Sequence, residues 1–400
     1  MKSGGGSDKV FKETRVAGSI TPVPLGEPRP ANVAELEAEL SALWRSAADD
    51  STGKTAVTRA CTLTLLIYVE SDEAAYEVNN LVAEVTRQNP CRTIIMRLEP
   101  EASPSGFEAW VSAHCHLPLA GEKQVCSEQI TIRARGEAVQ GLASLVLPLT
   151  VSGLPIFLWW RAGSFSPPSY LDQILRVTQH VIVDTARFQP GGMHLKELAE
   201  WSRKVAGKVQ VTDLNWARLT PWRDLIAQYF DSPERRPFLE RLSAVRIEYE
   251  QESERLVTQR AQGLLLTGWL ASRLGWEFVM SERRDAAQPR TFYFKSASGV
   301  VKVDRVLKKV AGGCGVCFAI ELSSGGSSPA RFSFSRGADG KVVETLAEIP
   351  GLPSLGRSVR LEVLEEAEIL NEELKLGVRD QRYEEALGVV ARMIASPASV

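Results

Sequence analysis

The stretch from Leu147 to Arg161 constrains the fold most. It reads LPLTVSGLPIFLWWR, and only Ser152, Gly153 and two prolines interrupt its apolar residues. A strand that is buried on both faces carries such a continuous apolar run, whereas a surface helix carries an apolar stripe on one side. We therefore expect a buried central strand that ends at Arg161.

This strand ends on Trp159, Trp160 and Arg161. Two indoles and a guanidinium form a rigid amphipathic platform, and Trp and Arg often anchor contacts between proteins. Paired tryptophans are also common in cores, with one polar edge left accessible. The residues alone leave both a partner-binding platform and a core position open.

A β-α-β unit precedes the central stretch. Strand signals at Arg59–Glu70 and Thr93–Arg97 flank a helical pattern at Ala74–Arg87. This order predicts two parallel strands joined by a right-handed crossover. No G-x-G-x-x-G follows the first strand, so we expect no dinucleotide cofactor.

A cluster of histidines and cysteines follows. His114, Cys115, His116 and Cys126 could supply the nitrogen and sulfur ligands that zinc prefers. On a strand, however, Cys115 points away from both histidines. We expect a hairpin from Trp110 to Ile132 and no metal site.

A second α/β unit is predicted after Arg161. It has a helix at Tyr170–His180 and a short strand at Val181–Thr185. Asp184 then lies at the carboxyl end of a strand, where open α/β sheets place functional groups. A helix or loop cap is the alternative role for this side chain.

A second group of tryptophans and arginines follows the helix predicted at Met193–Val205. Thr220 is a natural N-cap before Pro221 at the start of a helix. If both groups lie at one edge of one sheet, they form a single cluster that lines a pocket or faces a partner. The members of the second group are Asn215, Trp216, Arg218, Trp222 and Arg223.

The remaining chain completes a predicted α/β architecture. A strand at Ala244–Tyr249 and a helix at Thr258–Leu274 complete the second unit, and from Arg290 short alternating strands predict an antiparallel sheet with a closing helix at Asp380–Ile394. The predicted fold class is two α/β units with mixed, largely parallel sheets, followed by a C-terminal antiparallel β segment. We expect a flexible arm at 1–30, α/β domains at 31–161 and 162–284, and a β-rich domain at 285–400.

Charge and composition exclude several classes of protein. The 47 basic and 49 acidic residues give a net charge of -2, too little to hold nucleic acid or an anionic membrane. The N-terminus lacks the apolar core of a signal peptide, and no apolar run reaches the roughly 18 residues of a membrane span. These features predict a cytoplasmic protein.

The six cysteines are too few for a disulfide framework and are expected to be thiols unless one pair is redox-active. The G-G-C-G-V-C spacing makes Cys314 and Cys317 one candidate redox pair. Because the stretch continues into a strand, where residues three apart point to opposite faces, we predict two reduced thiols there. The four histidines follow no nucleophile-elbow or helical metal pattern, which indicates a protein that is not an enzyme.

Seven ordered segments resemble one known family. They are CTLTLLIYVE, QNPCR, VSAHC, QVCSEQITI, LPIFLWWR, DLNWARLTPWR and LLLTGWLASRLGW, and they lie between Ala31 and Trp276. This set is similar to the glucose-6-phosphate dehydrogenase assembly protein family, OpcA.

The resemblance implies a non-catalytic, cytoplasmic bacterial effector that binds and activates glucose-6-phosphate dehydrogenase. In cyanobacterial members cysteine oxidation links that activation to thioredoxin, and Cys115 and Cys126 fall within family motifs. A second hypothesis from the residues is a sugar-phosphate enzyme or sensor that uses Arg161, Arg218 and Arg223 around a pocket.

Overall fold

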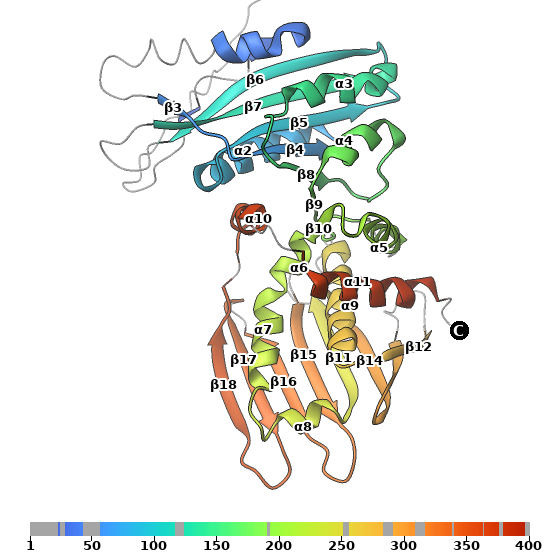
Figure 1. Ribbon diagram of the computed structural model, residues 1–400. Helices are drawn as coiled ribbons and strands as arrows, with labels where there is room; N and C mark the ends of the chain where they lie inside the picture. The colour runs from blue at the N-terminus through green and yellow to red at the C-terminus, as the bar shows by residue number, and fades with distance from the viewer. Residues whose placement is uncertain are drawn as a thin grey trace, which may run out of the picture.

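Two β-sheets organise the chain, and they are built mainly from its N-terminal and C-terminal halves respectively (Figure 1). The structure is a computed structural model. It describes residues 23–24, 29–42, 57–116, 124–189, 193–250, 256–282, 291–308, 317–337, 340–362, 364–375 and 379–396.

The first sheet has parallel strands at its centre. Its main order is β1-β6-β7-β5-β4-β8-β9-β10, with β2 paired to β6 and β3 paired to β7. Neighbouring strands from β7 through β5, β4, β8 and β9 to β10 pair in parallel, as does β3 with β7. Strand β6 pairs antiparallel with β7, β1 and β2. The strands are β1 (Val23–Pro24), β2 (Arg29–Ala31), β3 (Val57–Arg59), β4 (Leu63–Val69), β5 (Cys91–Glu99), β6 (Gly106–His116), β7 (Gln124–Arg135), β8 (Ile156–Arg161), β9 (His180–Val183) and β10 (Gln210–Asp213).

The second sheet is antiparallel except where β11 pairs in parallel with β14. Its order is β12-β13-β14-β11-β15-β16-β17-β18. The strands are β11 (Leu242–Glu250), β12 (Glu277–Glu282), β13 (Thr291–Ser296), β14 (Gly299–Lys308), β15 (Cys317–Ser324), β16 (Arg331–Arg336), β17 (Val342–Glu348) and β18 (Leu355–Arg360).

Helices cover both faces of the first sheet and one face of the second. Figure 1 shows α7, α8, α9 and α11 on the second sheet, with α10 and α11 near the junction of the two sheets. The α-helices are α2 (Asp72–Gln88), α3 (Leu142–Val146), α4 (Asp172–Val177), α5 (Met193–Val205), α6 (Leu214–Arg218), α7 (Thr220–Tyr229), α8 (Arg236–Leu239), α9 (Leu256–Arg273), α10 (Glu366–Lys375) and α11 (Gln381–Ala395). The 3-10 helices are η1 (Val33–Glu35), η2 (Gly136–Gly141), η3 (Leu147–Leu149) and η4 (Ser169–Leu171).

The predicted α/β class, the closing helix and the hairpin are confirmed. The unit β4-α2-β5 has the expected parallel pairing, and α2 buries Val78, Val82 and Val85 at helical spacing against the sheet. Asp380 caps α11 by accepting a hydrogen bond from the backbone N–H of Tyr383 (3.0 Å).

The single long strand expected over Leu147–Arg161 is wrong in its first half. Leu147–Leu149 form a 3-10 helix, and only Ile156–Arg161 form β8. Gly153 has a φ of 77°, a left-handed conformation outside the extended region that regular strand residues adopt. Pro148 and Pro155 also lack the N–H that a central strand donates. The segment before Ile156 therefore forms a 3-10 helix and a turn in place of a strand.

Two further predicted elements have different bounds or partners. The helix predicted at Tyr170–His180 ends at Val177, and His180 begins β9. Strands β9 and β10 extend the first sheet, whereas β11 joins the second, so Ala244–Tyr249 does not complete an α/β unit with the strand at 180–183. The domain boundaries themselves stay a prediction, and the arm at 1–30 lies almost entirely outside the described residues.

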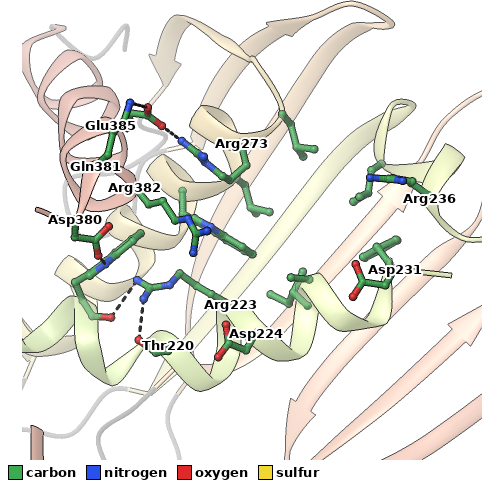
Figure 2. A pocket seen from close by; sticks show the side chains of 18 of the residues that line it. Thr220, Arg223, Asp224, Asp231, Arg236, Arg273, Asp380, Gln381, Arg382 and Glu385 are labelled. Carbon is green, nitrogen blue, oxygen red and sulfur yellow. Dashed lines mark hydrogen bonds and ion pairs between the residues drawn. The ribbon is translucent and has the colours of Figure 1, made fainter. Parts of the chain in front are cut away.

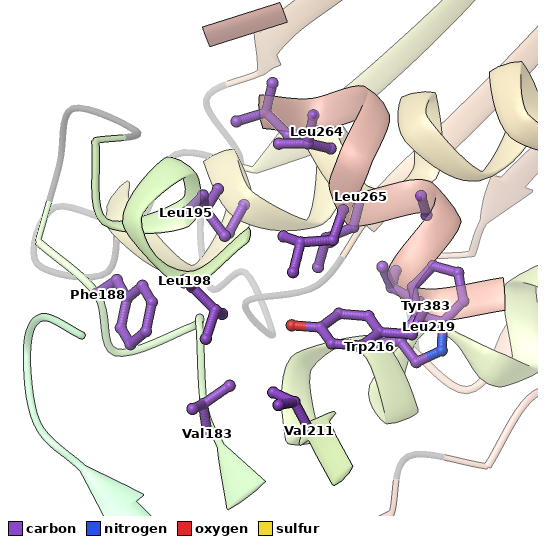
Figure 3. Packing of buried hydrophobic residues seen from close by; sticks show 14 of the residues in the cluster. Val183, Phe188, Leu195, Leu198, Val211, Trp216, Leu219, Leu264, Leu265 and Tyr383 are labelled. Carbon is purple, nitrogen blue, oxygen red and sulfur yellow. The ribbon is translucent and has the colours of Figure 1, made fainter. Parts of the chain in front are cut away.

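Two apolar cores lie on opposite faces of the first sheet. The smaller core packs α2 and α10 against β4 and β8, so a helix from the end of the chain covers the N-terminal sheet. The larger core continues from the other face into the helices of the second sheet. Figure 3 shows this junction, where Val183, Leu198, Val211 and Leu265 lie near Tyr383 of α11. The shared core ties the two sheets together.

No helix within the described residues is long and apolar enough to span a membrane.

Candidate functional site

The carboxyl ends of three parallel strands lie side by side at one edge of the first sheet. β8 ends at Arg161, β9 at Val183 and β10 at Asp213. The strand register places Trp160 beside Val183, and Val183 beside Asp213. Side chains at the ends of parallel strands share one edge. The sheet therefore brings Arg161 and Asp184, which the sequence analysis singled out, to one region with Asp213, which it did not.

Arg161 is a buried cation held by two helices. Its Nη2 lies 2.8 Å from Glu77 Oε2 on α2 and 3.5 Å from Glu366 Oε2 on α10, and its Nη1 donates to the carbonyl of Ala74 (3.3 Å). Burial lowers the pKa of Arg161, and the two carboxylates oppose that shift. Arg161 thus binds α10 to the first sheet.

Asp184 is both a cap and an ion-pair partner. Its carboxylate accepts two hydrogen bonds from Arg218, at 2.7 and 3.0 Å, and one from the backbone N–H of Ala186 at 3.1 Å. Arg187 links this pair to α10, because its Nε lies 3.6 Å from Asp184 and its Nη2 lies 3.1 Å from Glu366. Burial alone would lower the pKa of Arg218, but the charge of Asp184 raises it above its ordinary value.

We call this chain of charges the edge ion network. Its members are Glu77, Arg161, Asp184, Arg187, Arg218 and Glu366.

A second layer of hydrogen bonds, centred on the Asp213 carboxyl group, lies next to the edge ion network. Asp213 Oδ1 accepts from the backbone N–H groups of Thr185 (3.0 Å) and Asn215 (2.9 Å), and Oδ2 accepts from Thr185 Oγ1 (2.6 Å). Asn215 donates to Thr185 Oγ1 (3.1 Å) and accepts from Gln262 of α9 (3.0 Å). Tyr383 of α11 donates to Asp213 Oδ2 at 3.5 Å. These contacts join the first sheet to α9 and α11.

Two buried carboxyl groups in this region have unusual acidities. Burial raises the pKa of Asp213 to about 7, and the charge of Asp184 adds to the shift. Burial likewise raises the pKa of Glu373 on α10 to about 7, although a hydrogen bond from Thr212 lowers it in part. Both groups therefore take up a proton near neutral pH.

The tryptophans of β8 are core residues on opposite faces of the sheet. Trp159 packs in the smaller core, while Trp160 stacks on Tyr68 with ring centroids 4.2 Å apart. Adjacent strand residues point in opposite directions, which separates the two indoles. Trp160 is 2% exposed and donates its Nε1–H to the carbonyl of Ser164 (2.6 Å). Almost no indole surface is therefore accessible to a binding partner at this position.

The tryptophans of the second group also lie apart from each other. Trp216 donates its Nε1–H to Asp380 Oδ2 (2.7 Å), and the guanidinium of Arg223 lies 3.4 Å from the centre of its ring. Trp222 is buried over the second sheet, with the guanidinium of Arg336 5.6 Å from its ring. The expected single cluster is therefore wrong. Arg161 and Arg218 meet in the edge ion network, but the indoles lie in separate places.

Thr220 is not the N-cap that the sequence predicts. Asp213 caps the preceding helix α6 by accepting from the backbone of Asn215, and α7 follows after Leu219 with no side-chain cap. Thr220 Oγ1 instead accepts a hydrogen bond from Arg223 Nη2 (2.8 Å).

A pocket of about 890 Å³ lies between α7, α8, α9 and α11, beside Trp216 and Arg223 (Figure 2). We call it the arginine pocket. Its apolar wall includes Ile226, Phe230, Leu239, Trp269 and Leu270. Its arginines are Arg223, Arg236, Arg273, Arg379 and Arg382, and its acidic residues are Asp224, Asp231, Asp380 and Glu385.

Cys115 and Cys126 face each other across β6 and β7 and form a disulfide. The general expectation of free thiols is wrong for this pair, and its sulfur atoms are not thiolates that could bind zinc. Among the described residues, no group of three or more His, Cys, Asp or Glu side chains is arranged to hold a metal ion. Cys314 lies outside the described residues, and Cys317 is the first residue of β15.

Sequence reasoning missed the acidic partners of the site. Glu77, Glu366 and Glu373 lie on helices whose many charged residues resemble an ordinary solvated face. The apolar spacing of Ile369, Leu370 and Leu374 could have indicated the helix α10, but not the sheet that it covers.

Comparison with known proteins identifies the family. Residues 82–200 match the model of the glucose-6-phosphate dehydrogenase subunit N-terminal domain, and residues 209–387 match that of the C-terminal domain of the same subunit. The two matches follow each other in the chain and include the arginine pocket and every member of the edge ion network except Glu77.

Cyanobacterial relatives agree with this assignment. A protein of Nostoc punctiforme is 34% identical over 201 residues, which are 50% of this chain and 41% of the relative. A protein of Synechocystis is 32% identical over 202 residues, 50% of this chain and 40% of the relative. Both are provisionally named OxPP cycle protein OpcA. The matched region spans less than half the length of these relatives.

Solved structures are only distantly similar. An oxidoreductase from Parabacteroides merdae has a TM-score of 0.47 and 10% identity, with 82% of this chain and 96% of that chain covered. The Saccharomyces cerevisiae protein Gal80p, as a super-repressor mutant, has a TM-score of 0.45 and 11% identity, with 84% and 95% covered. Nothing about function follows from similarities this low. On the family matches, the chain belongs to the glucose-6-phosphate dehydrogenase subunit family, OpcA.

Proposed function

We propose that the protein binds glucose-6-phosphate dehydrogenase and activates it allosterically, without catalysing a reaction itself. The observation that carries this proposal is the match of both halves of the chain to the two domains of one dehydrogenase subunit family. The names of the cyanobacterial relatives, which refer to the oxidative pentose phosphate cycle, support the same role.

The internal pairing of charges supports a role that is structural and regulatory. Arg161 and Arg218 point at carboxylates of this chain and are neutralised there. Asp213 has the raised pKa of a general acid or base, but its side chain is fully buried and bonded to Thr185 and Asn215, so no substrate reaches it. The groups with perturbed acidity thus hold helices to the sheet.

An activator of this kind needs only a difference in affinity. If the chain binds the active conformation or oligomer of the dehydrogenase more tightly than the inactive one, it shifts the population toward the active state. A tenfold shift requires about 1.4 kcal/mol of differential binding.

The proposal is tested with the purified chain and the dehydrogenase from the same genome. Light scattering measures the mass of the mixture, and NADP reduction measures the rate at increasing amounts of the chain. We expect a complex and a saturable rise in the rate of NADP reduction by the dehydrogenase. The chain alone should not reduce NADP. Absence of a complex would refute the binding, and a complex with an unchanged rate would refute the activation.

We place this role in the cytoplasm and include thioredoxin as a second partner. The disulfide between Cys115 and Cys126 is the bond that thioredoxin would reduce to two thiols. Both residues are buried, so the end of the hairpin must open before a reductant can reach them. If this is right, thioredoxin changes the activation by the wild-type chain but not by Cys115→Ser/Cys126→Ser.

A further inference from the structure

The arginine pocket contains cations with no carboxylate partner among the described residues. Arg273 pairs with Glu385, and Arg379 pairs with Glu384. No ion pair within 4.0 Å joins Arg223, Arg236 or Arg382 to a described carboxylate. This pattern differs from the edge ion network, where each arginine has an acidic partner.

Arg223 is held rigidly in place. Its guanidinium stacks on the indole of Trp216 at 3.4 Å, while Nη1 donates to the Trp216 carbonyl (3.1 Å) and Nη2 donates to Thr220 Oγ1 (2.8 Å). Both acceptors are uncharged, so neither of these two hydrogen bonds neutralises the guanidinium. Burial lowers the pKa of Arg223 to about 10, and the charges of Asp380 and Asp224 only partly oppose that shift.

Arg382 adds a second cation to the same space. Figure 2 shows Arg223 of α7 and Arg382 of α11 near each other in the pocket, with the Arg223 guanidinium turned toward Trp216 and Thr220. The charge of Arg382 is close enough to lower the pKa of Arg223. Two like charges repel, so this arrangement is stabilised when an anion lies between them.

Three carboxyl groups act on Arg223 through their charge, namely Asp380, Asp224 and the buried Glu373, and none of them forms an ion pair with it within 4.0 Å. Asp380 Oδ2 accepts from Trp216 Nε1 (2.7 Å) and Oδ1 accepts from the backbone N–H of Tyr383 (3.0 Å). Asp224 and Asp231 are exposed. The space between Arg223 and Arg382 is therefore open to an external anion.

We propose that the arginine pocket binds a sugar phosphate, with its phosphate between Arg223 and Arg382. A phosphomonoester carries close to two negative charges at pH 7 and offers three acceptor oxygens, which match two guanidinium groups. The volume of about 890 Å³ suits a small metabolite. Trp269 and Leu270 supply an apolar wall for the sugar ring, and Asp224 at the rim accepts hydrogen bonds from hydroxyls.

The test uses the full chain without the dehydrogenase, so its outcome is separate from that of the proposed function. Isothermal titration with glucose 6-phosphate, glucose and inorganic phosphate compares the three probes. We expect glucose 6-phosphate to bind at least about tenfold more tightly than either of the others, because it alone uses both parts of the pocket. Equal affinity for glucose 6-phosphate and inorganic phosphate would overturn the assignment to a sugar phosphate.

Two variants on one helix locate the site. Arg382→Gln removes a pocket cation, and Arg392→Gln removes an exposed cation of α11 outside the pocket. Arg382→Gln should weaken the binding of glucose 6-phosphate about tenfold or more and leave the circular dichroism spectrum unchanged. Arg392→Gln should bind glucose 6-phosphate with the affinity of wild type. Equal affinities in both variants, or no binding by wild type at millimolar probe, would refute the proposal.

Discussion

Replacing Asp213 with Asn should remove a pH dependence from the stability of the protein. The Asp213 carboxyl ionises near 3.8 in the unfolded chain and near 7 in the folded one, because burial penalises its charged form. The folded state therefore keeps a proton that the unfolded state has lost. This contribution to stability is fully present below about pH 4 and is lost as pH rises through about 7.

The magnitude follows from the raised pKa. Each unit of pH between the two pKa values changes the free energy of unfolding by about 1.4 kcal/mol. Between pH 5.5 and pH 8, the ionisation of Asp213 should therefore lower the free energy of unfolding of wild type by roughly 2 kcal/mol. Asn cannot ionise, but its Oδ1 can still accept from the backbone N–H groups of Thr185 and Asn215. Asp213→Asn should therefore lack this loss.

Denaturant unfolding followed by tryptophan fluorescence at pH 5.5 and pH 8 measures the effect. Glu373, with a pKa also raised to about 7, adds the same trend to both proteins, so the difference between wild type and variant isolates Asp213. Asp172→Asn is the matched control, because Asp172 is exposed at the start of α4. Parallel pH profiles for wild type and Asp213→Asn would refute the raised pKa.

Three further predictions concern packing, the edge ion network and the disulfide. Trp160→Ala should lower the free energy of unfolding by about 3–5 kcal/mol, because it leaves a cavity beside Tyr68; a loss below about 1 kcal/mol in denaturant unfolding would contradict a core role. Arg218→Met should cost about 2–4 kcal/mol at pH 8, since it leaves Asp184 buried with the more distant Arg187, and equal melting temperatures for variant and wild type would contradict this. Cys115→Ser should lower stability by up to about 3 kcal/mol under oxidising conditions and remove the effect of reductant, which thermal melts with and without dithiothreitol can check.

Local patterns in the sequence predicted several elements because the information lies within a few residues. The apolar spacing of Val78, Val82 and Val85 indicates α2 wherever that helix packs, and α5 begins and ends where its pattern predicts. Strand alternation around a turn likewise predicted the hairpin of β6 and β7. The tryptophan platform failed because neighbours on a strand face opposite sides, and both sides here are covered.

Only the tertiary structure decided which sheet each strand joins and which charges meet. The sequence predicts both β9 and β11 as short strands, but long-range pairing places one in each sheet. Glu366 resembles any exposed helical glutamate in the sequence, yet it lies 3.5 Å from Arg161, far away along the chain. The residue type alone does not specify whether water or a distant partner surrounds a charged side chain. The site could therefore be predicted only as residue types near a sheet edge, and folding selected their partners.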